Sequence, residues 1–217
     1  MIKVLVADDH DLVRNGIVRM LQDIDDITVV AEANCGESAI SQCREQAVDV
    51  VLMDVRMPGI GGLEATKKLV RLSPDTKVIA VSACEDDPFP SRLLKAGASG
   101  FVSKGADISE IIQAIRAVRI GQRYLSPSVA QQLALKSFGN DNLDSPFEAL
   151  SERELQICMM IVNCHKVAYI SETLHLSPKT VNSYRYRVFE KLDISSDVEL
   201  TLLAIRHGMV EVGVQES

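Results

Sequence analysis

The sequence lacks any apolar run long enough to cross a membrane. No stretch approaches the ~18 consecutive apolar residues that a spanning helix requires. The first ten residues, MIKVLVADDH, contain an apolar run of strand length rather than the apolar core of a secretion signal. We therefore expect a cytoplasmic location and no membrane partner.

Paired cysteines are also lacking. The chain has five cysteines, an odd number, and none of them forms a C-x-x-C motif. Neither a disulfide framework nor a zinc site is indicated. We expect free thiols in a reducing compartment.

Basic residues are fewer than acidic ones, 23 against 30, so the formal net charge is -7. This deficit argues against a nucleic-acid binder that works through global charge, but it permits a local basic patch. The 47% of hydrophobic residues is ordinary for a globular protein. A length of 217 residues is enough for two domains.

Short runs rich in β-branched residues recur in the first half of the chain, at residues 2–7, 28–31, 48–53, 77–81 and 99–102. The segments between them mostly have helical periodicity, and one apolar stripe joins Leu12, Val13, Ile17, Met20 and Leu21. Strands that alternate with helices every ~25 residues indicate βα units and a mainly parallel sheet. Residues 1–121 are therefore predicted to form an α/β domain.

The rest of the chain changes character. Residues 122–148 are dense in turn formers and are predicted to be a linker, part helical and part flexible. Residues 149–211 lose the strand signals and predict a domain of four helices, followed by a tail at 212–217. Ser151 and Glu154 form a capping box, and Ser177 with Pro178 marks the start of another helix. A short helix, a tight turn and a longer helix together predict a helix-turn-helix.

Polar side chains stand at the ends of the predicted strands of the first domain. Asp8 and Asp9 end the first strand, Asp54 the third, Ser82 the fourth, and Lys104 follows the fifth. In an open parallel sheet the functional site lies at these carboxyl ends. Three crowded carboxylates require a cation, and an all-oxygen site without His or Cys suits Mg²⁺. With the lysine, such a site predicts aspartyl-phosphate chemistry, in which a serine hydroxyl could bond a phosphoryl oxygen.

The stretches DDHDLVR, MDVRMPGIGG, SA and GASGFVSK together resemble the receiver domain of bacterial two-component response regulators. The resemblance implies a flavodoxin-like (βα)5 fold with sheet order 2-1-3-4-5. It also implies that Asp54 accepts a phosphoryl group from a sensor kinase histidine and that Lys104 contacts that group. The implied Mg²⁺ ligands are Asp8, Asp9, Asp54 and the backbone carbonyl of Arg56. Ser82 and Phe101 match the switch positions. Such a protein is a phosphoacceptor, with at most self-phosphorylation and self-dephosphorylation, rather than an enzyme.

The third helix of the second domain is basic although the chain is acidic. In the major groove of DNA, an Asn side chain can read adenine, and a Lys or Arg side chain can read guanine. The alternative interpretation is that this basic helix is simply a solvated face. LSERELQI and LSPKTVNSYRYRVFEKL resemble the LuxR-type helix-turn-helix of the NarL/FixJ class. The predicted contacts with double-stranded DNA are Lys179, Thr180, Asn182, Ser183, Arg185, Tyr186, Arg187 and Lys191.

The final helix carries an apolar stripe of Val198, Leu202 and Ile205. Core packing is the default interpretation of such a stripe, but the resemblance implies that this helix mediates dimerisation on DNA with paired half-sites. Over its full length the chain is similar to the GacA/UvrY/LetA group. That resemblance implies a hybrid sensor kinase of the BarA/GacS/LetS type, a homodimer when phosphorylated or DNA-bound, and promoters of small regulatory RNAs as targets.

Two other functions remain open from the sequence. A Mg²⁺-dependent phosphohydrolase also forms an aspartyl-phosphate, but its D-x-D-x-T pattern is missing after the first strand, where DDHDL stands. A protein-interaction adaptor would leave no sequence-specific DNA footprint and no salt-dependent affinity.

Overall fold

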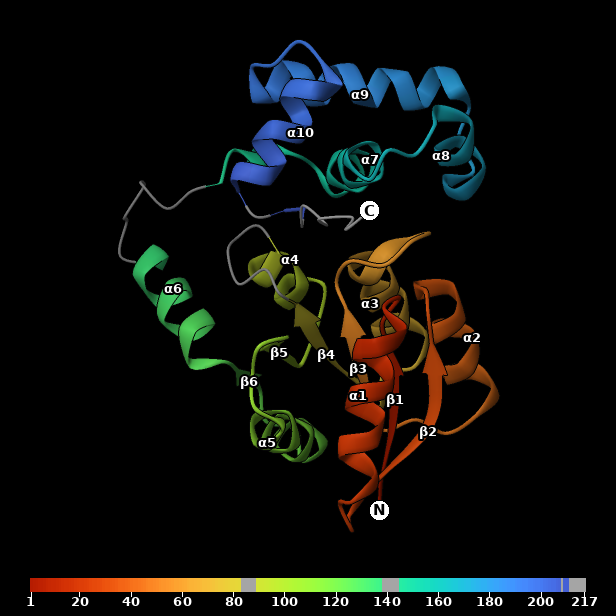
Figure 1. The fold of residues 1–217 in the computed structure, drawn as a ribbon, viewed down its shortest axis with the longest axis vertical. Helices are drawn as coiled ribbons and strands as arrows, with labels where there is room; N and C mark the ends of the chain where they lie inside the picture. The colour runs from red at the N-terminus through yellow and green to blue at the C-terminus, as the bar shows by residue number, and fades with distance from the viewer. Residues whose placement is uncertain (83–88, 138–144, 208, 211–217) are drawn as a thin grey trace, which may run out of the picture. The chain divides into compact units, whose positions relative to one another are not determined.

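The computed structural model describes residues 1–82, 89–137, 145–207 and 209–210, and the chain forms two compact units (Figure 1). One lies within residues 1–137 and the other within residues 145–210. Part of the predicted linker, residues 138–144, and the predicted tail lie outside the described residues.

The first unit is built on a parallel sheet of six strands in the order β2-β1-β3-β4-β5-β6. The strands are β1 (Ile2–Ala7), β2 (Ile27–Ala33), β3 (Val50–Asp54), β4 (Lys77–Ser82), β5 (Gly100–Ser103) and β6 (Tyr124–Leu125). The predicted order of the first five strands is confirmed. The two-residue β6 was not predicted, because it is too short to show periodicity, and it carries the sheet past the boundary expected at residue 121.

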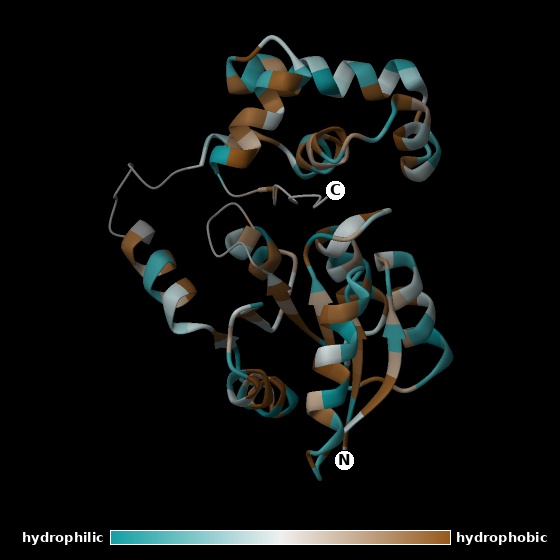
Figure 2. Cartoon of the chain, in the orientation of Figure 1, coloured by the Kyte–Doolittle hydropathy of each residue, from teal (hydrophilic) through white to brown (hydrophobic). Residues whose placement is uncertain are grey.

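Helices cover both faces of this sheet (Figure 1). They are α1 (Asp11–Gln22), α2 (Gly36–Glu45), α3 (Gly61–Leu72), α4 (Phe89–Lys95) and α5 (Ile108–Arg119). The apolar side chains of α1 and α5 share one core cluster with Val50 and Leu52, whereas those of α2 and α3 share another with Val51 and Met53. The strand β3 is therefore apolar throughout because alternate side chains enter two different cores. Figure 2 shows the central strands as hydrophobic and the helices as banded.

One apolar stripe is narrower than the sequence predicts. In α1 only Ile17 and Leu21 are buried, whereas Leu12 is 87% and Met20 50% exposed. The prediction was wrong for these two residues, since they lie beside the stripe that faces the sheet rather than on it.

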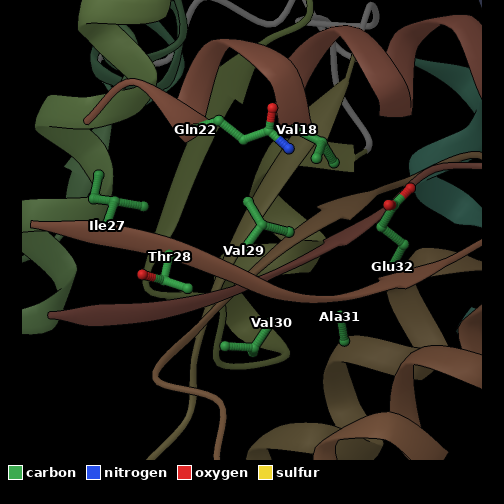
Figure 3. A pocket seen from close by; sticks show the side chains of 8 residues that line it. All are labelled: Val18, Gln22, Ile27, Thr28, Val29, Val30, Ala31 and Glu32. Atoms are coloured by element: carbon green, nitrogen blue, oxygen red, sulfur yellow. The ribbon is translucent and has the colours of Figure 1, made fainter. Parts of the chain in front are cut away.

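The outer strand β2 borders a hollow of about 470 Å³ (Figure 3). Val18 and Gln22 come from α1, and Val29 points toward them. Val29 pairs with Val4 and Ala31 with Leu5, so the register shifts by one residue and Val30 has no register partner on β1. Such bulges protect exposed sheet edges. Glu32 is the one ionisable side chain in its lining, so catalytic groups do not gather there.

The segment after β6 forms α6 (Pro127–Ser137), in which Val129 is fully buried. The second unit begins with a 3-10 turn, η2 (Pro146–Ala149). Four helices follow: α7 (Glu152–Val162), α8 (Val167–Leu174), α9 (Pro178–Leu192) and α10 (Asp197–Arg206). Side chains from α7, α8 and α9 form its core cluster.

The predicted start signals of two helices are confirmed. Ser151 and Glu154 bond each other's backbone N–H groups at the start of α7, and the Ser177 hydroxyl accepts the Thr180 N–H at the start of α9. Among the described residues no helix is long and apolar enough to span a bilayer. The four cysteines that the structure describes are all free thiols.

Candidate phosphoacceptor site and nucleic-acid interface

Two buried carboxylates and a lysine meet at the carboxyl ends of the strands. Asp8 follows β1 and is 2% exposed, and Asp54 ends β3 and is 1% exposed. Lys104, which follows β5, places its Nζ 2.8 Å from Asp8 Oδ2 and 2.9 Å from Asp54 Oδ2. The structure thus brings together three residues that are 46 to 96 positions apart in the printed sequence.

Backbone groups fix the other carboxylate oxygens. The Arg56 N–H donates to Asp54 Oδ1 at 3.0 Å, and the His10 N–H donates to Asp8 Oδ1 at 2.8 Å. The Lys104 N–H donates to the Ser82 carbonyl at 2.9 Å, which holds the end of β5 against the end of β4. One oxygen of each carboxylate therefore faces the backbone and the other faces the lysine.

The loop after Asp54 depends on a glycine. A Cβ atom on Gly62, at the start of α3, would lie 2.0 Å from the Asp54 carbonyl oxygen. The Gly62 N–H donates to the Val55 carbonyl at 3.1 Å. Only a residue without a side chain allows α3 to begin this close to β3, which explains Gly62, while the φ of +73° at Gly61 explains the first glycine of the pair.

Burial, with a smaller contribution from the nearby Asp8 carboxylate, raises the pKa of Asp54 to a net value of about 6. Lys104 and the Arg56 N–H act in the opposite direction. For Lys104, burial lowers the pKa, but attraction by Asp54 and hydrogen bonds to both carboxylates outweigh it, so that the net shift is upward. The lysine therefore stays charged while Asp54 retains more basicity than an ordinary aspartate.

The site has a surplus of acid on its open side. Asp9 has a side chain that is 32% exposed, and ligand atoms of Asp8, Asp9, His10 and Asp54 lie within 4.8 Å of one another. Three carboxylates face one lysine, so a divalent cation would balance the charge. Oxygen ligands with an open, hydrated side suit Mg²⁺, and these residues fit that ion.

His10 is a member of this cluster that the sequence analysis missed. Its Nδ1 lies 3.0 Å from Asp9 Oδ1 and 3.4 Å from Asp8 Oδ1. The expectation of a site without histidine is therefore corrected. DDH carries the signal, but His10 is not a strand-end residue, since it immediately precedes α1.

The two predicted switch residues are buried in neighbouring strands. Ser82 is 1% exposed and pairs with Ser103 across β4 and β5, while Phe101 is fully buried and pairs with Ala80. Ser82 therefore lies at the same edge as Asp54. Arg56, whose carbonyl was predicted as a metal ligand, is half-buried in the loop that follows.

One face of α9 presents polar side chains to solvent. Lys179, Asn182, Ser183 and Tyr186 have the spacing of a single helix face, and Tyr186 is 66% exposed. Arg187 is exposed, and Thr180 is half-buried beside the Ser177 cap. Six of the eight predicted DNA contacts are thus at least partly accessible without breaking an ion pair that the structure records.

The other two predicted contacts are tied into ion pairs within the unit, although both side chains remain partly exposed. Arg185 forms a two-point ion pair with Asp197, at 2.7 and 2.5 Å, which joins α9 to the start of α10. Lys191 lies 2.6 Å from the buried Glu154 carboxylate and 3.2 Å from the Ala149 carbonyl. Charge alone did not separate these structural cations from the accessible ones.

The apolar stripe of α10 faces solvent rather than the core. Val198 is 69%, Leu202 52% and Ile205 36% exposed, whereas Leu200 and Ala204 are fully buried. Core packing of this stripe is therefore the wrong interpretation. A groove of about 440 Å³ adjoins it and includes Val198 and Leu202 in its lining.

The family model for the response regulator receiver domain matches residues 4–116, and the model for bacterial regulatory proteins of the luxR family matches residues 148–204. The chain belongs to the LuxR-family response regulators. It is 66% identical to the response regulator GacA of Pseudomonas aeruginosa over 97% of this chain and 99% of GacA. It is 57% identical to the response regulator UvrY of Escherichia coli K12 over 96% of both chains. Within the LuxR family it therefore belongs to the GacA and UvrY group.

Solved structures agree with the assignment of this chain to the LuxR-family response regulators. A LuxR-family two-component response regulator from Aurantimonas is 34% identical, with a TM-score of 0.60 over 63% of this chain and 97% of its own. The Salmonella typhimurium response regulator RcsB covers 95% of this chain and 98% of its own, with a TM-score of 0.77 and 24% identity. The second likeness supports the fold alone.

Proposed function

We propose that this response regulator is a transcriptional regulator activated by phosphorylation of Asp54. The observation that carries the proposal is the buried Asp54 carboxylate at the end of β3, 2.9 Å from the Lys104 ammonium and beside two further acids. A carboxylate in such surroundings can act as a nucleophile toward phosphorus.

In the proposed transfer, an Asp54 oxygen forms a bond to phosphorus as the phosphorus–nitrogen bond of a kinase phosphohistidine breaks. The leaving imidazole nitrogen takes up a proton. Lys104 neutralises a phosphoryl oxygen, and the buried Ser82 hydroxyl can donate to another. Asp8, Asp9 and Asp54 would hold Mg²⁺, which supplies further neutralisation of the transferred group's charge. The protein is thus proposed to be a phosphoacceptor rather than an enzyme with external substrates.

The accessible face of α9 is the proposed reader of promoter DNA. Lys179 and Arg187 supply phosphate contacts, and Asn182 supplies a side chain able to read adenine. A recognition helix in the major groove uses residues of its N-terminal half in this way.

Known relatives of the fold support dimeric binding. RcsB has been solved on promoter DNA in the presence of the phosphomimetic BeF3-, and as two dimers on two parallel DNAs. By analogy we infer that this chain binds paired half-sites as a dimer and uses the α10 stripe of Val198, Leu202 and Ile205. We also infer a cytoplasmic location, where promoter DNA is available.

The partner and the targets follow from the likeness to GacA and UvrY. We infer a hybrid sensor kinase of the BarA/GacS/LetS type as phosphoryl donor and genes of small regulatory RNAs as targets.

A genome-wide footprint with and without a phosphodonor tests the proposal. The wild type should gain footprints at promoters on phosphorylation, whereas Asp54→Asn should gain none. Asp25→Asn, which alters an exposed acid after α1, is the matched control and should behave as the wild type. Footprints that increase equally in Asp54→Asn would contradict the proposal.

A further inference from the structure

Ser126 is a buried residue at the start of the linker helix α6. It is 2% exposed and immediately precedes Pro127, and its carbonyl accepts the Ala130 N–H at 2.9 Å. A serine in this position commonly bonds the amides of its own helix. Here the recorded partners of its hydroxyl lie in two other elements.

The Ser126 hydroxyl connects β5 with α5. It accepts the Ser103 N–H at 3.2 Å and donates to Glu110 Oε1 at 2.5 Å. The Ser126 N–H in turn donates to the Phe101 carbonyl at 3.0 Å. Ser126, the residue immediately before α6, therefore makes two hydrogen bonds to β5 and one to α5.

The rest of β6 strengthens this attachment. Tyr124 pairs with Gly100, and Leu125 pairs with Phe101, in the parallel ladder between β5 and β6. Burial, and to a smaller extent the Glu110 charge, raises the pKa of the Tyr124 hydroxyl. The start of the linker is consequently part of the sheet and of its hydrogen-bond network.

This network touches the phosphoacceptor site directly. Ser103, which Ser126 holds, immediately precedes Lys104, and Lys104 bonds both Asp54 and Asp8. A phosphoryl group on Asp54 would change the partners of Lys104 and therefore the position of the chain at Ser103. Because protein interiors are densely packed, such a shift must be taken up by the groups bonded to that strand.

We propose that Ser126, with Glu110, is the positioning residue that transmits the state of Asp54 to the linker helix α6. The inference rests on the proposed function, since it requires that Asp54 be phosphorylated. It adds the route by which the receiver unit acts on the linker.

Hydrogen exchange of the full-length chain, with Mg²⁺ and with or without beryllofluoride as the phosphoryl mimic, tests this route without knowledge of the operator. In the wild type, beryllofluoride should change the exchange rates of the Ala130 amide, which bonds the Ser126 carbonyl, and of the following α6 amides, as well as those near Asp54. In Ser126→Ala, the α6 amides should exchange about tenfold faster without beryllofluoride, because two hydrogen bonds of a buried hydroxyl are lost. They should then show no further response to beryllofluoride.

Three variants make the test specific. Ser126→Thr keeps the hydroxyl and should restore the beryllofluoride response of α6. Ser128→Ala removes an exposed serine of the same helix and should behave as the wild type. Glu110→Ala, at a half-buried surface position, should uncouple α6 as Ser126→Ala does, and it serves if that variant fails to fold.

The outcomes separate the inference from the proposed function. If α6 of Ser126→Ala and of Glu110→Ala still responds to beryllofluoride as in the wild type, the transmitting role is wrong. The same holds if wild-type α6 gives no response while the amides near Asp54 do. If beryllofluoride changes nothing near Asp54 in the wild type, the proposed function itself fails.

Discussion

At the scale of single residues, Asp54 is a buried carboxylate that must be ionised to attack phosphorus. Burial and the Asp8 charge raise its pKa to about 6, while Lys104 and the Arg56 N–H partly offset them. A free aspartate near pKa 3.8 would be the weaker base. The arrangement therefore makes Asp54 a better nucleophile but leaves two buried acids sharing one lysine, which destabilises the folded protein at neutral pH.

Replacing Asp54 with Asn should stabilise the protein at neutral pH in the absence of metal. A carboxyl whose folded pKa is raised binds its proton more tightly when folded, so its contribution favours folding below the unfolded pKa of 3.8 and is lost as pH rises through about 6. At pH 7, Asp54→Asn should raise the free energy of unfolding by roughly 2 kcal/mol. Urea unfolding in a chelator at pH 4.5 and pH 7 measures this difference, which should shrink at the lower pH.

Added Mg²⁺ should narrow the same difference, because the wild type offers the ion three carboxylates and the variant two. Asp25→Asn, an exposed acid, should leave the stability unchanged at both pH values. An Asp54→Asn variant less stable than the wild type at pH 7 would show that the pairing with Lys104 outweighs burial.

The residues that end the parallel strands could be predicted to meet, but the hydrogen bonds between them could not. Asp8, Asp54 and Lys104 converge because parallel strands end at one edge, which is a property of the pattern. His10 was missed because it belongs to a helix start. The internal pairing of Arg185 and Lys191 depends on the packing of α7, α9 and α10, which side-chain type does not reveal.

At the scale of elements, α9 has two kinds of cation. Lys191 reaches back to Glu154, which is 5% exposed, and this pair joins the end of α9 to the start of α7. Lys179 is exposed at the other end of the helix. One lysine is therefore available to DNA, while the other holds two helices together.

Lys191→Ala should cost stability, whereas Lys179→Ala should cost DNA affinity. Removing Lys191 leaves a buried carboxylate without its cation, and because the lysine is partly exposed we expect a loss of about 1–2 kcal/mol. Lys179→Ala should leave unfolding unchanged and lower the salt dependence of DNA binding by about one unit of slope. Thermal unfolding and salt-dependent titrations measure the two effects. Equal stability losses would contradict the division of roles.

The Glu154 carboxylate also makes the second unit sensitive to acid. Burial raises its pKa, but the Lys191 bond and the bonds from Ser151 outweigh this, and the net pKa is below its ordinary 4.5. A carboxyl with a depressed folded pKa contributes stability above its unfolded pKa, and that contribution is lost as pH falls through the folded value. Glu154→Gln should remove this dependence, so that the stability gap to the wild type narrows below pH 4.5. A stability gap between Glu154→Gln and the wild type that stays constant with pH would contradict this role of the Glu154 carboxylate.

Elements with strong local signals were predictable, and those set by packing were not. The capping box of α7 and the Ser-Pro start of α9 mark those helices in the sequence. The helix α4 has only weak patterning, although Phe89 and Leu93 bury it against its neighbours. The strand β6 exists because β5 offers it a partner, a condition that no local pattern of two residues can record.

At the scale of the whole molecule, the exposed stripe of α10 is the apolar surface that we propose a second copy covers. Side chains at i, i+4 and i+7 share one helix face, and a two-fold interface places the same face of each copy against the other. The three exposed aliphatic side chains lie beside a groove of about 440 Å³ that includes Val198 and Leu202 in its lining. On DNA, half-sites one helical turn apart would bring two such stripes together.

Leu202→Asp should therefore abolish dimer formation on DNA while leaving the fold intact, because the side chain is 52% exposed in the single chain and a charge there is solvated. In the dimer the same carboxylate would be buried against its symmetry mate. Sedimentation of the beryllofluoride-treated protein with a footprinted promoter fragment should give two copies per site for the wild type and one, with weaker binding, for the variant. Ile120→Asp, which charges a 74% exposed residue in the first unit, should keep two copies. Two copies of Leu202→Asp bound with wild-type affinity would move the dimer contact away from α10.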